Sequence, residues 1–261
     1  CFHMTHMHHP LAGDVTLEEV KKYPLPTVAD NALEQAAAET RDIHASGLAA
    51  MGGMGCTIWE ISWYIRSMED LMADMAAEDE RAVVHLDRLT DLACERSRIC
   101  ARAGMDIIQY GDDIGMQHST MMSVDMWRQW LKPRFARVIR AAKEIKPDIL
   151  AFYHSCGYVL PFLDDLIEIG VDILNPVQPE CMAFDEVHKL VGNRLSFWGT
   201  IGTQTTLPFG TPEEVRRVVR SRLETCGAKG GILIAPTHLV EPEVPWANLQ
   251  AMAEEAWAFK A

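Results

Sequence analysis

A histidine and a cysteine stand two residues apart in the stretch AFYHSCGYV, as His154 and Cys156. Side chains two apart in an extended chain point to the same side, so this imidazole and this thiol can face one space. Both are ligands that zinc prefers. A Cys–His nucleophilic pair is less favoured, because such neighbours project in parallel rather than meeting at hydrogen-bond distance. The remaining alternative is a strand end whose cysteine is a small hydrophobe.

A second histidine, His238, follows a later apolar run in APTHLVEP. Together with His154 and Cys156 it would give two imidazoles and one thiolate, a three-ligand zinc set that leaves a fourth position for water or substrate. Three protein ligands and an open fourth position are typical of catalytic zinc sites, whereas structural zinc sites have four protein ligands. Cys181 is a further thiol that could approach this metal.

Other polar residues also follow apolar runs. Asp112 and Asp113 are adjacent, so we expect only one of them to point inward, with a solvated acidic turn as the alternative. The same kind of position is occupied by Gln117 and His118 after GDDIGM, Gln178 in PVQPEC, and Trp198 and Gln204 in FWGTIGTQ.

Six apolar segments alternate with longer amphipathic segments, which is the pattern of βα units around a parallel sheet. Ser123 and Thr211 are expected to cap helices, the latter in a capping box with Glu214, and Gly104, Gly170 and Gly227 are expected to end helices. The expected strands span residues 48–55, 105–111, 148–154, 172–178, 195–200 and 230–236, and prominent expected helices span 78–104, 123–145 and 211–227.

The fold class predicted from this pattern is α/β, a (β/α)8 TIM-type barrel over residues 1–261 as a single domain. Eight strands are required and six are expected, so two N-terminal strands are expected to be missing from this chain. A doubly wound open sheet is the alternative, but no G-x-G-x-x-G or P-loop motif is present. In a barrel the candidate residues above would meet at the carboxyl ends of the strands.

Composition narrows the function classes. The net charge is −13 and the pI is near 5.2, which disfavours nucleic acid or an anionic membrane as partner. No apolar run is long enough to span a membrane, and seven scattered cysteines do not form a secreted disulfide pattern, so we expect a cytoplasmic protein with reduced thiols. His3, His6, His8 and His9 are expected to form a surface segment, and the start at Cys1 suggests a processed or longer polypeptide.

The sequence resembles the uroporphyrinogen decarboxylase superfamily over nearly its whole length. The segments that carry the resemblance include HHPLAGDVTLEEVKKYPLP, GDDIGMQHSTMMSVDMWRQWLKP, HSCGYVLPFLDDLIEIGVDILNPVQP, LPFGTPEEVRRVV and GGILIAPTHLVEPEVPWANLQAM. The resemblance implies a (β/α)8 barrel. The superfamily holds cofactor-free porphyrinogen decarboxylases and cobalamin-linked methyltransferases, and the latter carry zinc on an H-x-C pair and a later cysteine.

His154 and Cys156 match that pair, whereas His238 stands where the later cysteine is expected. The leading interpretation is therefore a zinc-dependent methyltransferase that acts between a small O- or S-methyl compound and a corrinoid protein. The resemblance also allows a homodimer, which family members often form. The alternatives are a porphyrinogen decarboxylase without cofactor, in which His238 contacts substrate, and a non-catalytic small-molecule-binding barrel. The interpretation assigns metal binding to His154, Cys156 and His238, catalysis to Asp113 and His238, and substrate binding to Asp112, Gln117, Tyr153, Gln178 and Trp198.

Overall fold

The computed structural model describes residues 7–226 and 230–260. The expectations for Cys1, His3, His6 and Gly227 lie outside these residues. His8 is exposed, and His9 is half-buried with its Nδ1 3.0 Å from the carbonyl oxygen of Tyr64. The N-terminal segment thus runs along the surface in its described part.

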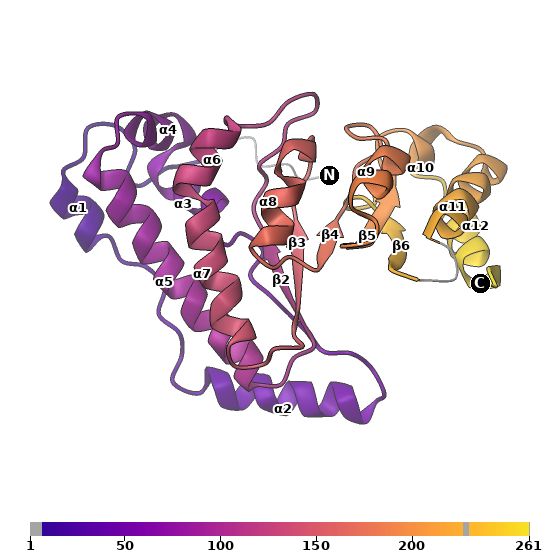
Figure 1. Cartoon of the computed structure of the whole chain (residues 1–261), viewed down its shortest axis with the longest axis horizontal. Coiled ribbons are helices and arrows are strands. Elements are labelled where there is room, and N and C mark those ends of the chain that lie inside the picture. Colours follow the sequence, from indigo (N-terminus) through magenta and orange to yellow (C-terminus); the bar gives the residue numbers. More distant parts are fainter. Residues whose placement is uncertain (1–6, 227–229, 261) are drawn as a thin grey trace.

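One parallel sheet of six strands forms the centre, and each strand pairs with the next along the chain (Figure 1). All six predicted strands are confirmed; five are shorter than their apolar segments, and β5 keeps the expected length but begins one residue later. The register places Gly111, His154 and Asn175 side by side at the carboxyl ends of three neighbouring strands. The strands are β1 (Met51–Gly53), β2 (Ile107–Gly111), β3 (Leu150–His154), β4 (Ile173–Asn175), β5 (Ser196–Ile201) and β6 (Ile232–Pro236).

Helices follow the strands as the amphipathic segments predict. The stretch expected as one helix over 123–145 forms two, because Pro133 lacks the N–H that would continue the first helix and suits the first turn of the second. They are α1 (Leu17–Lys22), α2 (Ala32–Ala45), α3 (Trp59–Arg66), α4 (Met68–Ala76), α5 (Glu80–Arg102), α6 (Val124–Trp130), α7 (Lys132–Lys143), η1 (Leu160–Phe162), α8 (Leu163–Glu168), α9 (Phe184–Val191), α10 (Thr206–Phe209), α11 (Pro212–Cys226) and α12 (Trp246–Ala258).

The two predicted N-caps are confirmed. Ser123 Oγ accepts a hydrogen bond from the Met126 backbone N–H at 3.1 Å. Thr211 and Glu214 form the reciprocal capping box, with Thr211 N–H donating to the Glu214 carboxylate at 2.8 Å and Glu214 N–H donating to Thr211 Oγ1 at 3.3 Å. Each cap satisfies backbone donors that would otherwise lack a partner at a helix start.

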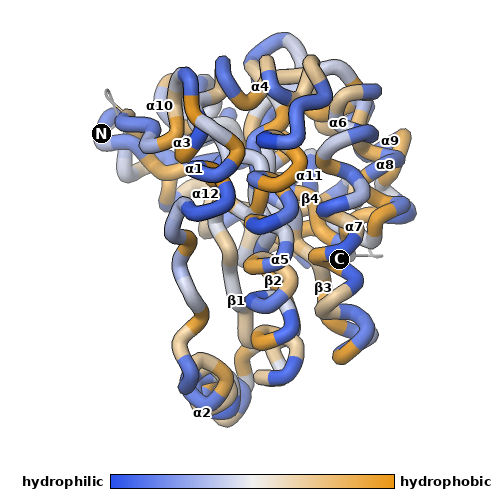
Figure 2. The backbone as a smooth tube through the Cα atoms, turned by 90° about the vertical axis from the view of Figure 1, so that its left-hand side faces the viewer, coloured by the Kyte–Doolittle hydropathy of each residue, from blue (hydrophilic) through white to orange (hydrophobic). Residues whose placement is uncertain are grey.

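The main core lies where α5 and α7 cover β2 and β3 (Figure 1). Tyr110 and Tyr153 point from adjacent strands toward Phe135 of α7 and meet its ring edge to face at centroid distances of 6.5 and 5.3 Å. A smaller cluster joins Ile201 to α11 and α12 at the other end of the sheet. Figure 2 shows hydrophilic and hydrophobic residues alternating along the helices, as one-sided packing requires.

The sheet is open between its first and last strands. Within the described residues β1 and β6 each pair with one strand, and the sequential order β1 to β6 is that of consecutive strands in a (β/α)8 barrel. Helix α2 lies below α5 and α7, at the side where the strands begin (Figure 1). No helix in the described part of the chain combines the length and hydropathy needed to cross a membrane.

Candidate active site

Three side chains with metal-ligating atoms meet beyond the carboxyl ends of β2 and β3. His154 Nε2 lies 3.6 Å from Cys156 Sγ and 3.6 Å from Asp113 Oδ1. All three atoms lie within 4.8 Å of one another. The predicted H-x-C pair therefore does face one space, and a carboxylate joins it.

The His154 ring is held in one tautomer and one orientation. Its Nδ1 lies 2.5 Å from Asn175 Oδ1, while Asn175 Nδ2 donates to the Trp198 carbonyl oxygen at 2.7 Å. Because the amide nitrogen is committed to that carbonyl, Asn175 Oδ1 must accept, and His154 Nδ1 must carry the proton. The lone pair of Nε2 then points toward Cys156 and Asp113, as in a metal-ligating histidine oriented by a second residue.

Asp113 is fixed by backbone contacts on both sides. Its Oδ1 accepts from the Cys156 N–H at 2.7 Å, and its own N–H donates to Glu60 Oε2 at 3.1 Å. The loops meet through Gly115 and Gly157, where a Cβ on either glycine would lie within 2.8 Å of the opposite backbone. Gly157 also has φ +82°, so glycine is needed there for both reasons.

The surroundings of the Cys156 thiol favour its neutral form. Burial, together with the negative charges of Asp113 and Glu60, raises its pKa to about 12. Burial and Asp113 also raise the pKa of Glu60. A space that disfavours additional negative charge to this degree suits a cation, which would stabilise the thiolate.

The donor set fits zinc. Ligands about 2.0 and 2.3 Å from a tetrahedral zinc ion lie roughly 3.5 Å apart, and both distances from His154 Nε2 are 3.6 Å. One neutral imidazole, one thiolate and one carboxylate would neutralise the ion. A zinc ion held by these three ligands is a weaker Lewis acid than a zinc ion held by the predicted two imidazoles and one thiolate.

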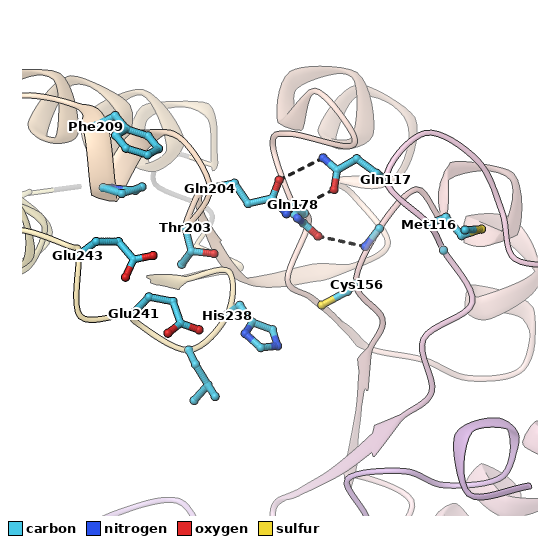
Figure 3. A pocket seen from close by; sticks show the side chains of 14 residues that line it. Met116, Gln117, Cys156, Gln178, Thr203, Gln204, Phe209, His238, Glu241 and Glu243 are labelled. Carbon is cyan, nitrogen blue, oxygen red and sulfur yellow. Dashed lines mark hydrogen bonds between the residues drawn. The ribbon is translucent and has the colours of Figure 1, made fainter. Parts of the chain in front are cut away.

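His238 lies across a cavity from this group. Its exposed ring and the Cys156 thiol approach the same space from opposite walls (Figure 3). His238 is not among the three residues whose ligand atoms lie within 4.8 Å of one another, and neither is Cys181. The structure thus brings together two of the three predicted ligands, with Asp113 in the place expected for His238.

The cavity has a volume of about 570 Å³. Cys156 and Gly157 lie at one wall, and the loops after β5 and β6 form the other (Figure 3). Gln117 and Gln204 exchange two hydrogen bonds of 3.2 and 3.3 Å between these walls. The lining also includes Gln178, whose Oε1 accepts from the Gly157 N–H at 3.1 Å and so holds the loop after Cys156.

Three predicted substrate-binding residues lie outside the cavity lining. Asp112 is fully buried, and its carboxylate accepts from the N–H groups of Thr57, Ile58 and Glu60 at 3.2, 2.9 and 2.9 Å. It caps α3, whose N-cap position offers no side-chain bond of its own. Burial raises the pKa of Asp112 to about 7, against the opposing effect of these N–H groups.

The other two are aromatic residues held by packing. Tyr153 is fully buried, and its hydroxyl donates to the Asp112 carbonyl oxygen at 3.0 Å. Trp198 packs edge to face on Phe152 at a centroid distance of 5.3 Å and uses its carbonyl to hold Asn175. Both therefore support the site from outside the cavity.

Sequence reasoning missed Asn175, Glu60, Glu241 and Glu243. Asn175 was detectable in principle, since it is a polar residue at the end of an apolar strand segment, as His154 is. Glu60 lies on α3 and reaches the site only through tertiary packing. Glu241 and Glu243 line the cavity from a loop that carries no motif.

A parallel α/β sheet with chemically active side chains gathered beyond its strand ends is the arrangement of TIM-barrel enzymes. The sequence model of the uroporphyrinogen decarboxylase (URO-D) family matches residues 8–259, and the chain belongs to this family. The predicted recognition of the family is thereby confirmed.

The relatives also confirm the predicted position nearer the methyltransferase branch. A methylated-thiol–coenzyme M methyltransferase of Methanosarcina mazei is 26% identical over 197 residues, which cover 73% of this chain and 48% of that protein. The chain thus spans about half the length of this curated relative.

Solved structures support the barrel-type fold. A methyltransferase from Methanosarcina mazei superposes with a TM-score of 0.72 at 21% identity, covering 95% of this chain and 70% of that one. A B12-independent methionine synthase from Shewanella sp. W3-18-1 gives a TM-score of 0.57 at 16% identity, covering 90% and 68%. At these identities the likeness concerns the fold alone.

Proposed function

We propose that this protein is a zinc-dependent methyltransferase acting between a small O- or S-methyl compound and the corrinoid of a partner protein. The observation that carries the proposal is the convergence of His154, Cys156 and Asp113 on one position, with His154 oriented by Asn175, in a chain whose relatives include methyltransferases. His238 is proposed to contact the bound methyl compound from the opposite wall.

In the direction of demethylation, the bond between the methyl carbon and its sulfur or oxygen breaks, and the electron pair stays on that heteroatom. The carbon bonds to the reduced corrinoid, the second substrate, which supplies the new electron pair. A zinc ion bound by the three residues would supply Lewis acidity beside the heteroatom as it gains charge. Gln178 holds the loop carrying Cys156, and Asn175 keeps His154 Nε2 unprotonated.

Nothing in the described cavity favours the decarboxylase alternative. A porphyrinogen carries several carboxylates, and cationic side chains would be needed to pair with them. None of the cavity-lining residues in the described part of the chain is Lys or Arg.

Metal analysis of the purified protein tests the proposal. We expect about one zinc per chain, lost in Cys156→Ala and strongly reduced in Asp113→Asn, because each removes one of three ligands. His238→Ala should keep the zinc but lose most methyl transfer to cob(I)alamin, followed by the change in visible absorbance. Cys181→Ala is the matched control and should keep both.

The contrary outcomes are separable. Zinc lost in His238→Ala but kept in Asp113→Asn would show that His238 is the third ligand, as the sequence predicted. Wild-type protein that binds no zinc and releases carbon dioxide from a porphyrinogen would refute the methyltransferase proposal in favour of a lyase.

A further inference from the structure

The cavity beside the candidate metal group has a strongly one-sided charge. Glu241 and Glu243 extend from the wall that also carries His238 (Figure 3). Among the described residues that line the cavity, His238 is the only side chain that can become cationic, since none is Lys or Arg. A ligand that enters this space therefore meets two carboxylates near the position proposed for the methyl transfer.

More carboxylates lie behind both walls. Asp113 and Glu60 stand behind Cys156, and Glu180 lies beneath the loop of Gln204, where its Oε1 accepts from the Thr205 hydroxyl at 2.8 Å. Glu180 Oε2 is buried without a hydrogen-bond partner. Within the described part of the chain, neither Glu60 nor Glu180 forms an ion pair with Lys or Arg, so the charges of these two carboxylates are not locally balanced, whereas a zinc ion would balance that of Asp113.

The rim adds an aromatic surface. Phe209 is 81% exposed at the mouth of the cavity, on the same side as the two glutamates. The face of an aromatic ring attracts cations, most strongly those with a diffuse charge such as quaternary ammonium groups. Carboxylates and an exposed aromatic ring together recognise a cation and repel an anion.

We infer that the methyl compound bound in this cavity carries a positive charge, as a quaternary ammonium or sulfonium group placed a few bonds from the methylated sulfur or oxygen. The inference rests on the proposed function and names the substrate class for that same site. Glu241 and Glu243 are the specificity-determining residues.

Two probes that share one methylthioethyl group but carry opposite charges test the effect of ligand charge on binding. They are (2-methylthioethyl)trimethylammonium, a cation, and 2-(methylthio)ethanesulfonate, an anion. Calorimetry on the zinc-loaded full chain should give a dissociation constant at least tenfold lower for the cation. The double variant Glu241→Gln/Glu243→Gln should lower this ratio at least fivefold by weakening the cation. Glu224→Gln, an exposed substitution near the far end of α11, should leave the ratio unchanged.

Equal or tighter binding of the sulfonate overturns the inference, and so does a double variant that keeps the wild-type ratio. If the double variant fails to fold, the single exposed substitution Glu243→Gln should lower the ratio in the same direction, and an unchanged ratio there also overturns it. Methyl transfer to cob(I)alamin is measured in parallel. Transfer from the sulfonate with the higher kcat/KM supports the proposed function while overturning the charge inference. Tighter binding of the cation without methyl transfer from either probe supports the charge inference while contradicting the proposed function.

Discussion

At the residue scale, Asn175 determines how well His154 can serve as a ligand. Replacing it with alanine removes the acceptor for Nδ1–H and frees the ring to rotate and to change tautomer. We expect Asn175→Ala to weaken zinc binding by about 10- to 100-fold, a typical effect of losing such a partner. Competition with a chromophoric chelator measures the change.

Asn193→Ala, at an exposed position on the surface, provides the control and should bind zinc as the wild type does. Wild-type zinc affinity in Asn175→Ala would show that the His154 orientation does not depend on this amide. The ligand role of His154 itself would then have to be tested separately.

The sequence identified some of these residues because their roles depend on local geometry. His154 and Cys156 face one space because they alternate along one extended segment. Local sequence could not show which of Asp112 and Asp113 points into the site. The Asp112 carboxylate points elsewhere because it accepts hydrogen bonds from backbone N–H groups some 50 residues earlier in the chain. The acidic wall around Glu241 arises from a loop whose path only the tertiary structure defines.

At the scale of elements, patterning predicted all six strands because each is a short apolar segment between amphipathic ones. Pro133 divides residues 123–145 into two helices, because proline lacks the N–H that a continuous helix needs. The position of His238 depends on how far the loop after β6 extends toward β3. That distance depends on the packing of β5, β6, α11 and α12 as a group, which periodicity does not report.

His85 shows how packing between elements creates a pH dependence. It lies buried on α5 with Nε2 3.0 Å from the Ser62 carbonyl oxygen of α3, and its Nδ1 has no hydrogen-bond partner. Burial lowers the pKa of His85 below its ordinary value of 6.5. The unfolded chain therefore binds this proton more readily than the native one, and the contribution to stability is lost as the pH falls below about 6.5.

We expect His85→Gln to remove this dependence, because an amide can still donate to the Ser62 carbonyl but does not titrate. Urea unfolding at pH 7.5, 6.5 and 5.5 should show a smaller loss of unfolding free energy on acidification in the variant than in the wild type. His118→Gln, an exposed substitution, should behave as the wild type. Parallel pH profiles for His85→Gln and the wild type would contradict the assignment.

At the scale of the whole molecule, the candidate site lies between two parts of the sheet with separate cores. One wall follows β2 and β3, beside the large core under α5 and α7, and the other follows β5 and β6, beside the small core under α11 and α12. Across the cavity, the described side chains exchange the two hydrogen bonds of the Gln117–Gln204 pair. A ligand that contacts both walls would therefore add interactions between two parts of the fold that few side-chain hydrogen bonds join across the cavity.

The metal alone should already stabilise the fold, because Asp113 and Cys156 come from loops that follow two different strands. A ligand that binds only the native state at 100 times its dissociation constant adds about 2.7 kcal/mol, which for a domain of this size corresponds to a Tm increase of about 5 to 10 °C. We expect zinc to produce such an increase in differential scanning calorimetry and EDTA to reverse it. His154→Ala should show little or no increase, whereas Glu224→Gln should respond as the wild type does. A wild-type Tm that does not change with zinc would mean that the three side chains do not hold the ion in the folded protein, however close their atoms lie.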